Sequence, residues 1–350
     1  MPFSGLHLKQ NLVSPAAHSL PDGSQEKLER RLGRLHARQR LGIERDHESQ
    51  VFGQGLRFFH PENLALSEIV IGGVLRMTGL YKLGRRNAAK IKLKHNDIVS
   101  PRLPAAFDGY RILHLSDLHT DMSQEAMARV LDLLPALDYN LCVLTGDYRA
   151  KTFGPYANSI AGMARLREAL TGPVYGVLGN HDTVRMVPDL EAMGIVMLLN
   201  ECVTLEREGQ RIHLAGIDDA HFFRVDNIEK AAEPIPHGSF SILLSHTPEI
   251  YRQAAHAGFD VLLAGHTHGG QICLPGGIPI TLDAALPRSF GAGAWAYGEM
   301  AGYTSAGAGS SVVPVRFNCS PEITLHCLRA ERRGRASIRP VPDVERVERP

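Results

Sequence analysis

The stretch Arg111-Ile112-Leu113-His114-Leu115-Ser116-Asp117-Leu118-His119 contains the pattern that decides the fold. It begins with an apolar run, Ile112 to Leu115, and ends on Asp117 and His119. Runs of this length that are rich in leucine and β-branched residues are typical of central strands covered on both faces. Because alternate side chains of a strand point to the same face, Asp117 and His119 are expected to leave the strand end side by side.

Four further polar motifs follow apolar runs in the same way. The later runs are Leu141–Leu144, Val174–Leu178, Ile242–Leu244 and Val261–Leu263, and the motifs after them are Gly146-Asp147, Gly179-Asn180-His181-Asp182, Ser245-His246 and Gly265-His266-Thr267-His268. In open α/β sheets, ligands bind outside the carboxyl ends of the strands, where all of these motifs fall. Each motif alone is weak, since a Gly-Asp pair is usually a turn. Their conjunction in one order predicts a site that uses only oxygen and imidazole donors.

The segments between the motifs predict an α/β fold. Ser123 to Leu137 has helical spacing with Ser123 as N-cap, and Ile160 to Leu170 offers a second crossover helix. Three short runs follow Asp182, and their close spacing predicts a more antiparallel second sheet: Ile195–Leu199, Val203–Glu206 and Ile212–Ile217. We therefore expect a two-sheet sandwich flanked by helices.

Together the five motifs resemble the calcineurin-like metallophosphoesterase superfamily, over about residues 108 to 330. A narrower likeness lies in Gly265–Ile272, Val313–Arg316 and Pro321–Ile323, which are similar to bacterial phosphodiesterases often found at membranes, a group that includes UDP-diacylglucosamine hydrolases. The resemblance implies a four-layer α/β/β/α sandwich of two mixed sheets.

The resemblance also implies two metal sites. The first would be held by Asp117, His119, Asp147 and His268, and the second by Asp147, Asn180, His246 and His266. A bridging carboxylate with mixed nitrogen and oxygen ligands can hold two divalent cations about 3.5 to 4 Å apart, which suits Asp147. By the same likeness, a metal-bridging hydroxide would attack phosphorus in line. His181 would stabilise the phosphate or protonate the leaving group, and Asp182 would orient its imidazole.

The predicted function is that of a dinuclear metal-dependent phosphohydrolase acting on a phosphodiester or pyrophosphate bond. The preference for diesters rests on the resemblance alone, so a phosphomonoesterase of the same fold stays open. A catalytically silent scaffold is the alternative from another class of protein. Carboxylate and amide oxygens favour manganese, whereas imidazole also tolerates iron and zinc. The expected substrate is a small phosphate ester, a lipid or a sugar nucleotide.

Composition limits the possible classes of protein but does not identify a partner. The chain has 350 residues, 44% of them apolar, and a net charge of +1, so bulk electrostatics identifies no ligand. Its five cysteines contain no C-x-x-C pair and indicate neither a disulfide framework nor a zinc knuckle. Residues 1–22 lack the apolar core of a secretion signal, so we expect a cytoplasmic protein. Isolated histidines such as His114 are expected to be structural.

Residues 1–103 are predicted to form a basic, amphipathic extension before a catalytic domain at 104–330 and a charged, flexible tail at 331–350. Basic runs lie at Lys27–Arg40 and Lys82–Lys94, and Leu28, Leu32 and Leu35 recur at helical spacing in the first. Ile69 to Leu83 is apolar but shorter than the roughly 20 residues that cross a bilayer.

Two interpretations of this extension stay open. Residues 24–95 either dock on the catalytic domain or make peripheral contact with the inner face of the membrane, through Val70, Val74, Met77 and Tyr81. The basic runs contain no nucleic-acid-binding motif, so nucleic acid is not an expected partner. Ala292 to Ser310, rich in glycine, is expected to be a lid over the metals or a surface loop.

Overall fold

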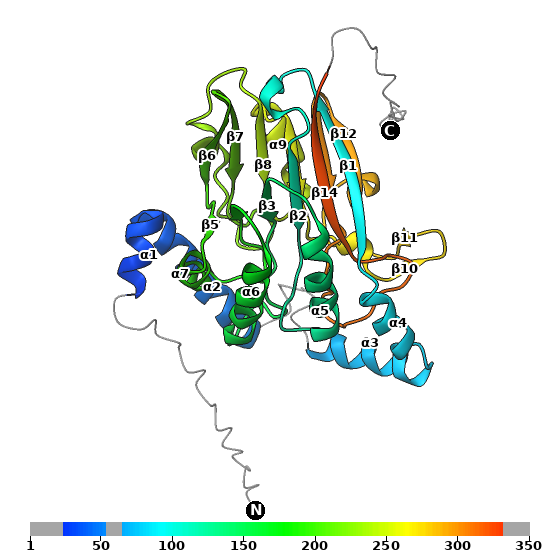
Figure 1. The fold of residues 1–350 in the computed structure, drawn as a ribbon. Helices are drawn as coiled ribbons and strands as arrows, with labels where there is room; N and C mark the ends of the chain where they lie inside the picture. The colour runs from blue at the N-terminus through cyan, green and yellow to red at the C-terminus, as the bar shows by residue number, and fades with distance from the viewer. Residues whose placement is uncertain (1–23, 54–64, 332–350) are drawn as a thin grey trace, which may run out of the picture.

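A computed structural model describes residues 24–53 and 65–331, which form a sandwich of two six-stranded sheets (Figure 1). In spatial order, the first sheet contains β1 (Lys92–Ser100), β14 (Glu322–Ala330), β2 (Arg111–Leu115), β3 (Leu141–Leu144), β4 (Val174–Gly176) and β5 (Ile195–Met197). The second contains β12 (Gly293–Tyr297), β13 (Met300–Thr304), β9 (Val261–Ala264), β8 (Ser241–Leu244), β7 (Gln210–Gly216) and β6 (Glu201–Arg207). A small hairpin, β10 (Cys273–Leu274) and β11 (Ile278–Pro279), stands apart from both sheets.

The apolar runs in the central strands β2 and β3 contain no charged residue because both faces of these strands are covered. In β3, Leu141 and Val143 belong to the apolar core between the two sheets, whereas Cys142 and Leu144 belong to a second core on the outer face. In β2, Ile112 and Leu113 divide between the same two cores. Successive strand residues point to opposite faces, so an apolar run places side chains in both cores at once.

Helices cover the two outer faces and complete the four layers. The outer face of the first sheet packs on α5 (Gln124–Leu133), α6 (Ala157–Ala169) and α7 (Val187–Ala192), and that of the second on α8 (Ile228–Ala232) and α9 (Tyr251–His256). Ser123 caps α5 by accepting a hydrogen bond from the Ala126 amide, which confirms the predicted helix start. The predicted four-layer α/β/β/α arrangement is confirmed.

One detail of the predicted topology is wrong. Ile195–Met197 is not in the second sheet but pairs in parallel with β4 in the first. The second sheet is the more antiparallel of the two, as predicted, because its edge pairs β6–β7 and β12–β13 are both antiparallel, whereas β14–β2 is the antiparallel pair of the first. Its inner strands β7, β8, β9 and β13 run in one direction. Close spacing along the sequence is typical of hairpins, and of the three expected runs the second and third form the β6–β7 hairpin, whereas the first does not.

The glycine-rich segment Ala292 to Ser310 is not a lid. Most of it is the β12–β13 hairpin at the edge of the second sheet, where Trp295 and Tyr303 are buried. Small residues suit this hairpin because a Cβ on Gly302 would overlap the Trp295 ring. The segment therefore extends the sheet that carries the site.

The N-terminal part contains two helix pairs, α1 (Ser24–Leu32) with α2 (Arg34–Gly53) and α3 (Ala65–Met77) with α4 (Tyr81–Ala88). Strand β1 follows α4 and pairs with β14 along its whole length. The domain boundaries stay a prediction, which we refine by placing the start of the catalytic unit at Lys92. Residues 1–22 and 332–350 lie outside the described residues. Among the residues described, none of the helices combines the length and apolar character that crossing a membrane requires.

Candidate metal centre

The candidate ligands lie where loops from both sheets meet at the carboxyl ends of the strands. The loop after β2 is hydrogen-bonded to the loop after β3, because the Asp117 and His119 amides donate to the carbonyls of Gly146 and Asp147. Gly146 allows this approach, since its φ is 89° and a Cβ there would lie 2.5 Å from the Gly179 nitrogen. Adjacent loops therefore hold the ligands at fixed positions.

Five proposed ligands have a left-handed backbone conformation. These residues, with their φ values, are Asp117 (49°), His119 (39°), Asp147 (58°), His266 (72°) and His268 (50°). Side chains other than glycine rarely adopt this conformation, which costs on the order of 1 kcal/mol or more per residue. Such strain is concentrated at functional sites, where the surrounding structure fixes it.

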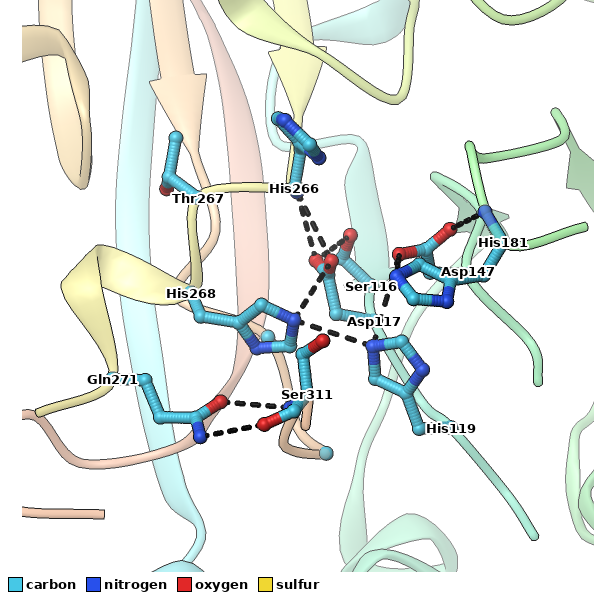
Figure 2. A network of polar contacts seen from close by, with 12 residues as sticks. Ser116, Asp117, His119, Asp147, His181, His266, Thr267, His268, Gln271 and Ser311 are labelled. Atoms are coloured by element: carbon cyan, nitrogen blue, oxygen red, sulfur yellow. Dashed lines mark hydrogen bonds and ion pairs between the residues drawn. The ribbon is translucent and has the colours of Figure 1, made fainter. Parts of the chain in front are cut away.

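The first ligand group gathers around His268 (Figure 2). The Nε2 atom of His268 lies 3.2 Å from His119 Nε2 and 3.5 Å from Asp117 Oδ1. His119 Nε2 is also 3.7 Å from Asp147 Oδ2. All four side chains are buried. In the sequence, Asp117 and His268 are 151 positions apart, and the fold brings the donor atoms of the group close together.

The second ligand group shares Asp147 with the first. His246 Nε2 lies 3.3 Å from Asp147 Oδ2 and 2.9 Å from Asn180 Oδ1. The ring of His266 is 5.0 Å from that of His246, and its Nε2 contacts the Asp283 carbonyl at 2.6 Å. With Nε2 donating to that carbonyl, the ligand atom of His266 would be Nδ1.

Backbone carbonyls orient two of the imidazoles. Nδ1 of His119 lies 2.7 Å from the Arg149 carbonyl, and Nδ1 of His246 lies 2.7 Å from the Thr145 carbonyl. A carbonyl only accepts, so each Nδ1 carries a proton, which leaves Nε2 as the atom that would coordinate a bound cation. This is the tautomer that metal-binding histidines need.

The electrostatics of the cluster suit a cation. Burial would raise the pKa of Asp147, but the neighbouring His246 and His181 bring it well below its usual range. Burial would lower the pKa of His246, yet the Asp147 and Asp117 carboxylates raise it to about 10. Burial lowers the pKa of His266 and His268, which keeps both neutral and able to coordinate. Buried carboxylates that draw positive charge to this point, with mixed oxygen and nitrogen donors, fit divalent metal ions.

Candidate metal-binding groups overlap around this centre. Two contain Asp117, one with His119 and His268 and the other with Asp147 and His246. A third combines His221 and His266 with the exposed Asp283. His221 lies beside His266, with ring centroids 4.2 Å apart, and its Nδ1 is 2.7 Å from Glu249 Oε2. Sequence reasoning gave His221 no part in the site.

His181 lies at the rim of both groups. Its Nε2 is 3.9 Å from Asp147 Oδ2, and its ring meets that of His119 edge to face at 5.2 Å. Its amide donates to Asp147 Oδ1, and its carbonyl accepts from the buried Arg149 guanidinium. The backbone of His181 is thus fixed on both sides, with the ring directed at the shared carboxylate (Figure 2).

Asp182 makes contacts that the sequence did not predict, while its role in orienting the His181 imidazole stays a prediction. Its two carboxylate oxygens accept hydrogen bonds from the amides of Asp147, Tyr148 and Gly179, at 2.7 to 2.9 Å. Asp182 therefore holds the two ligand loops together. The Thr152 hydroxyl lies 3.4 Å from His181 Nδ1.

Arg316 contacts a proposed ligand, although the sequence motifs gave it no role. It is fully buried, donates to the carbonyls of Ala306 and Gly309, and places its guanidinium 3.1 Å from His268 Nδ1. After burial and His119, Arg316 is a further cause of the lowered pKa of His268. In the sequence, its place in Val313–Arg316, a segment of the narrower family likeness, was the only indication of a role.

A buried polar chain supports Asp117 from behind. Asp117 Oδ2 accepts from the Ser116 hydroxyl, which in turn accepts from Thr145. The Thr145 hydroxyl contacts Nε2 of His114 at 2.8 Å, and Nδ1 of His114 is 3.2 Å from His326 Nε2. His114 thus lies behind the ligands, in a structural role as expected, and His326 is a partner that the motifs do not reveal.

Known proteins resemble the chain well beyond its motifs. A family model described as calcineurin-like phosphoesterase matches residues 110–270. The metallophosphoesterase YkoQ of Bacillus subtilis is 30% identical over 257 residues, which cover 71% of this chain and 93% of that protein. Phosphodiesterase YaeI of Escherichia coli is 25% identical over 236 residues, covering 62% of this chain and 81% of that protein. A solved structure, the sulfate thiohydrolase SoxB of Thermus thermophilus, aligns with a TM-score of 0.41 at 13% identity, covering 65% of this chain and 58% of that one.

Proposed function

Because the chain belongs to the calcineurin-like phosphoesterase family and is a metal-dependent phosphoesterase, we propose that it cleaves a phosphodiester or pyrophosphate bond at a dinuclear centre. The observation that carries this proposal is the position of Asp147. Its Oδ2 lies 3.7 Å from His119 Nε2 and 3.3 Å from His246 Nε2, and these histidines belong to different ligand groups. One carboxylate between two donor groups suits a bridging ligand.

The proposed ligand sets follow the two groups. Asp117, His119, Asp147 and His268 hold one ion, and Asp147, Asn180, His246 and His266 hold the other. When bound, two such cations supply Lewis-acid stabilisation of the phosphate and a water of lowered pKa as the nucleophile. Carboxylate, amide and imidazole donors together fit manganese well, with iron and zinc as alternatives.

The protein residues around the centre orient and stabilise the substrate and do not form a covalent bond with it. His181 is placed to donate to a phosphate oxygen or to the leaving group, because its backbone is fixed and its ring faces the shared carboxylate. Asp182 acts as a positioning residue, since it fixes the backbone of the loops that carry Asp147 and Asn180. Thr152 orients the His181 ring from its far side.

The preference for a diester has its support in the relatives. YaeI carries the name phosphodiesterase and shares 25% identity with this chain. The same donor groups can support hydrolysis of monoesters as well as diesters. An assay must therefore identify which bond the protein cleaves. Turnover of bis(p-nitrophenyl) phosphate and p-nitrophenyl phosphate, compared with manganese, zinc and iron in turn, separates the two classes.

Two substitutions test the assigned roles. We expect Asp147→Asn to lose most turnover and bound metal, because both ions lose their shared anionic ligand. We expect His181→Ala to keep its metal while turnover falls by on the order of 10² to 10⁴. Bound metal is measured by elemental analysis alongside the rate.

Matched controls remove trivial explanations. Asp138→Asn and His237→Ala change the same residue types at exposed positions and should retain turnover and metal. Near wild-type activity in Asp147→Asn would exclude a bridging role. Stoichiometric loss of metal in His181→Ala would make His181 a ligand. A protein that binds metal but turns over neither ester with any of these ions would be a scaffold.

A further inference from the structure

Among the residues whose exposure the structure describes, the large exposed apolar side chains are concentrated in two segments. Six large ones lie on α3, on α4 and in the turn between them: Ile69, Val70, Val74, Met77, Leu80 and Leu83. Three more belong to the β10–β11 hairpin and the residue after it, Leu274, Ile278 and Ile280, each more than half exposed. Clusters of this kind are uncommon on soluble surfaces and mark interaction sites. We call these nine side chains the docking face.

Both segments lie at the end of the sandwich that carries the metal ligands. Strand β14 is antiparallel to β2, and β1 is parallel to β14, so β1 begins at the carboxyl end of β2. Helix α4, which leads into β1, is therefore at the end from which Asp117 emerges. The β10 strand begins five residues after His268. Figure 1 shows α3, α4 and the hairpin close together on one side of this end.

The two segments are joined by the stretch 315–318. Helix α4 packs closely on it, because a Cβ on Gly84 would lie 2.7 Å from Val315 Cβ. On the other side, the Cys273 amide of β10 donates to the Phe317 carbonyl. Between these contacts, the Arg316 amide donates to the Gly84 carbonyl and its guanidinium reaches His268. The docking face is thus anchored to a proposed metal ligand.

Positive charge borders the docking face. Residues 69–94 contain no aspartate or glutamate. The exposed cations on and after the helices are Arg76, Lys82, Arg85, Arg86 and Lys90. Arg288 adds another beside the hairpin, since its guanidinium donates to the Pro279 carbonyl. Acids are also present: Glu68 belongs to α3, Glu125 lies 3.5 Å from Arg85, and Asp283 is exposed. Apolar side chains flanked by arginine and lysine suit an anionic lipid surface.

Helices α1 and α2 show the opposite pattern although they are also basic. Leu28 and Leu32 are buried in the core of the first sheet. Arg31 pairs with Glu191 and Glu201 at 2.7 and 2.6 Å. This part of the N-terminal region docks on the protein, so a basic composition alone does not distinguish the two helix pairs.

We propose that the docking face binds an anionic lipid bilayer and holds the metal centre at the membrane surface. Helix α3 has 13 residues, too few to cross a bilayer, and would lie in the interfacial region with its apolar side chains among the lipids. The phosphoester of an amphiphilic substrate would then reach the ligands without leaving the bilayer. This last step rests on the proposed phosphoesterase function, whereas membrane binding does not.

The test is cosedimentation of the full chain with vesicles, without added divalent cations. Vesicles of phosphatidylglycerol and phosphatidylcholine are compared with vesicles of phosphatidylcholine alone. We expect binding to the anionic vesicles that weakens with salt. The triple variant Val74→Ser, Met77→Ser and Leu83→Ser should lower the partition coefficient at least about tenfold, because it removes apolar insertion.

The matched control is the triple variant Leu35→Ser, Val99→Ser and Val196→Ser, whose residues are exposed apolar side chains elsewhere. It should bind like the wild type. Thermal unfolding checks that both variants fold, and hydrolysis of a soluble ester should be unchanged in both, which separates membrane binding from catalysis. Absence of wild-type binding, equal binding by the docking-face variant, or equal loss in the control would overturn the proposal. So would a dimer in solution that only the docking-face variant disrupts, since the face would then bind a second copy.

Discussion

His114 and His326 are buried side by side behind Asp117, in a chain of contacts that reaches the ligand through two hydroxyls. Burial lowers the pKa of His114 to about 3, and burial together with His114 lowers that of His326 well below its usual value. Both rings are neutral in the folded protein at neutral pH. They therefore act as hydrogen-bonding spacers that hold Ser116 and Asp117 in place.

These two histidines predict a pH dependence of stability. In the unfolded chain each takes up a proton below a pKa of about 6.5, whereas the folded form does not, so acid favours unfolding. Stability is fully present above about pH 6.5 and falls as pH drops toward 3, by about 1.4 kcal/mol per pH unit for each histidine. The free energy of unfolding, measured by urea between pH 7 and 5, should fall less steeply for His326→Gln than for the wild type. Equal slopes would show that His326 titrates alike in both states.

At this scale, the sequence predicted which residues meet but not how they are held. Asp117 and His119 were predicted as neighbours because strand alternation is a local property. The left-handed backbone at these positions depends on contacts between loops, which spacing does not encode. Arg316 and His326 belong to segments far along the chain from the ligands, so their roles appear only after folding. For the same reason the hydrogen bonds from backbone amides to Asp182 were not predicted.

The α2 helix braces one of the ligand loops. Glu44 accepts hydrogen bonds from the Thr183 hydroxyl and the Val184 amide, directly after the Asn180–Asp182 motif. Arg40 pairs with Glu44 at 3.0 Å, donates to the Asp182 carbonyl and is fully buried. The basic run Lys27–Arg40, for which docking on the catalytic domain and membrane contact both stayed open, thus includes a buried cation next to a ligand loop.

Removal of Glu44 should therefore destabilise the protein strongly. Glu44→Ala leaves the Arg40 guanidinium buried without its closest carboxylate. It also leaves the Thr183 hydroxyl and the Val184 amide without their hydrogen-bond acceptor. We expect a loss of about 3 kcal/mol in the free energy of unfolding, measured by urea denaturation. Arg129→Ala, which removes an exposed ion pair with Asp132, should change it by less than about 1 kcal/mol. A comparably small effect of Glu44→Ala would mean that α2 contributes little to the loop.

Elements were predicted well where burial on both faces left a clear sequence pattern, as in β2, β3, β8 and β9. Prediction failed where partner choice decided the outcome. Ile195–Met197 has the composition of a strand for either sheet, and its pairing with β4 follows from α7 returning the chain to the first sheet. The β12–β13 hairpin was hidden by its glycines, which serve packing against Trp295 rather than mobility.

For the whole molecule, function depends on two sheets that end at the same place. The first sheet supplies Asp117, His119, Asp147 and Asn180, and the second supplies His246, His266 and His268. A shift between the sheets would separate the two sets of donors, so the apolar core between them positions the site. The docking face extends this end of the sandwich and directs it to a membrane.

The central claim is that Asp147 bridges two metal ions, and anomalous diffraction from crystals grown with manganese tests it most directly. We expect two anomalous peaks about 3.5 to 4 Å apart, with a carboxylate oxygen of Asp147 within bonding distance of both. Peaks should also lie next to His268 on one side and His246 on the other. A single peak, or peaks away from Asp147, would contradict the account.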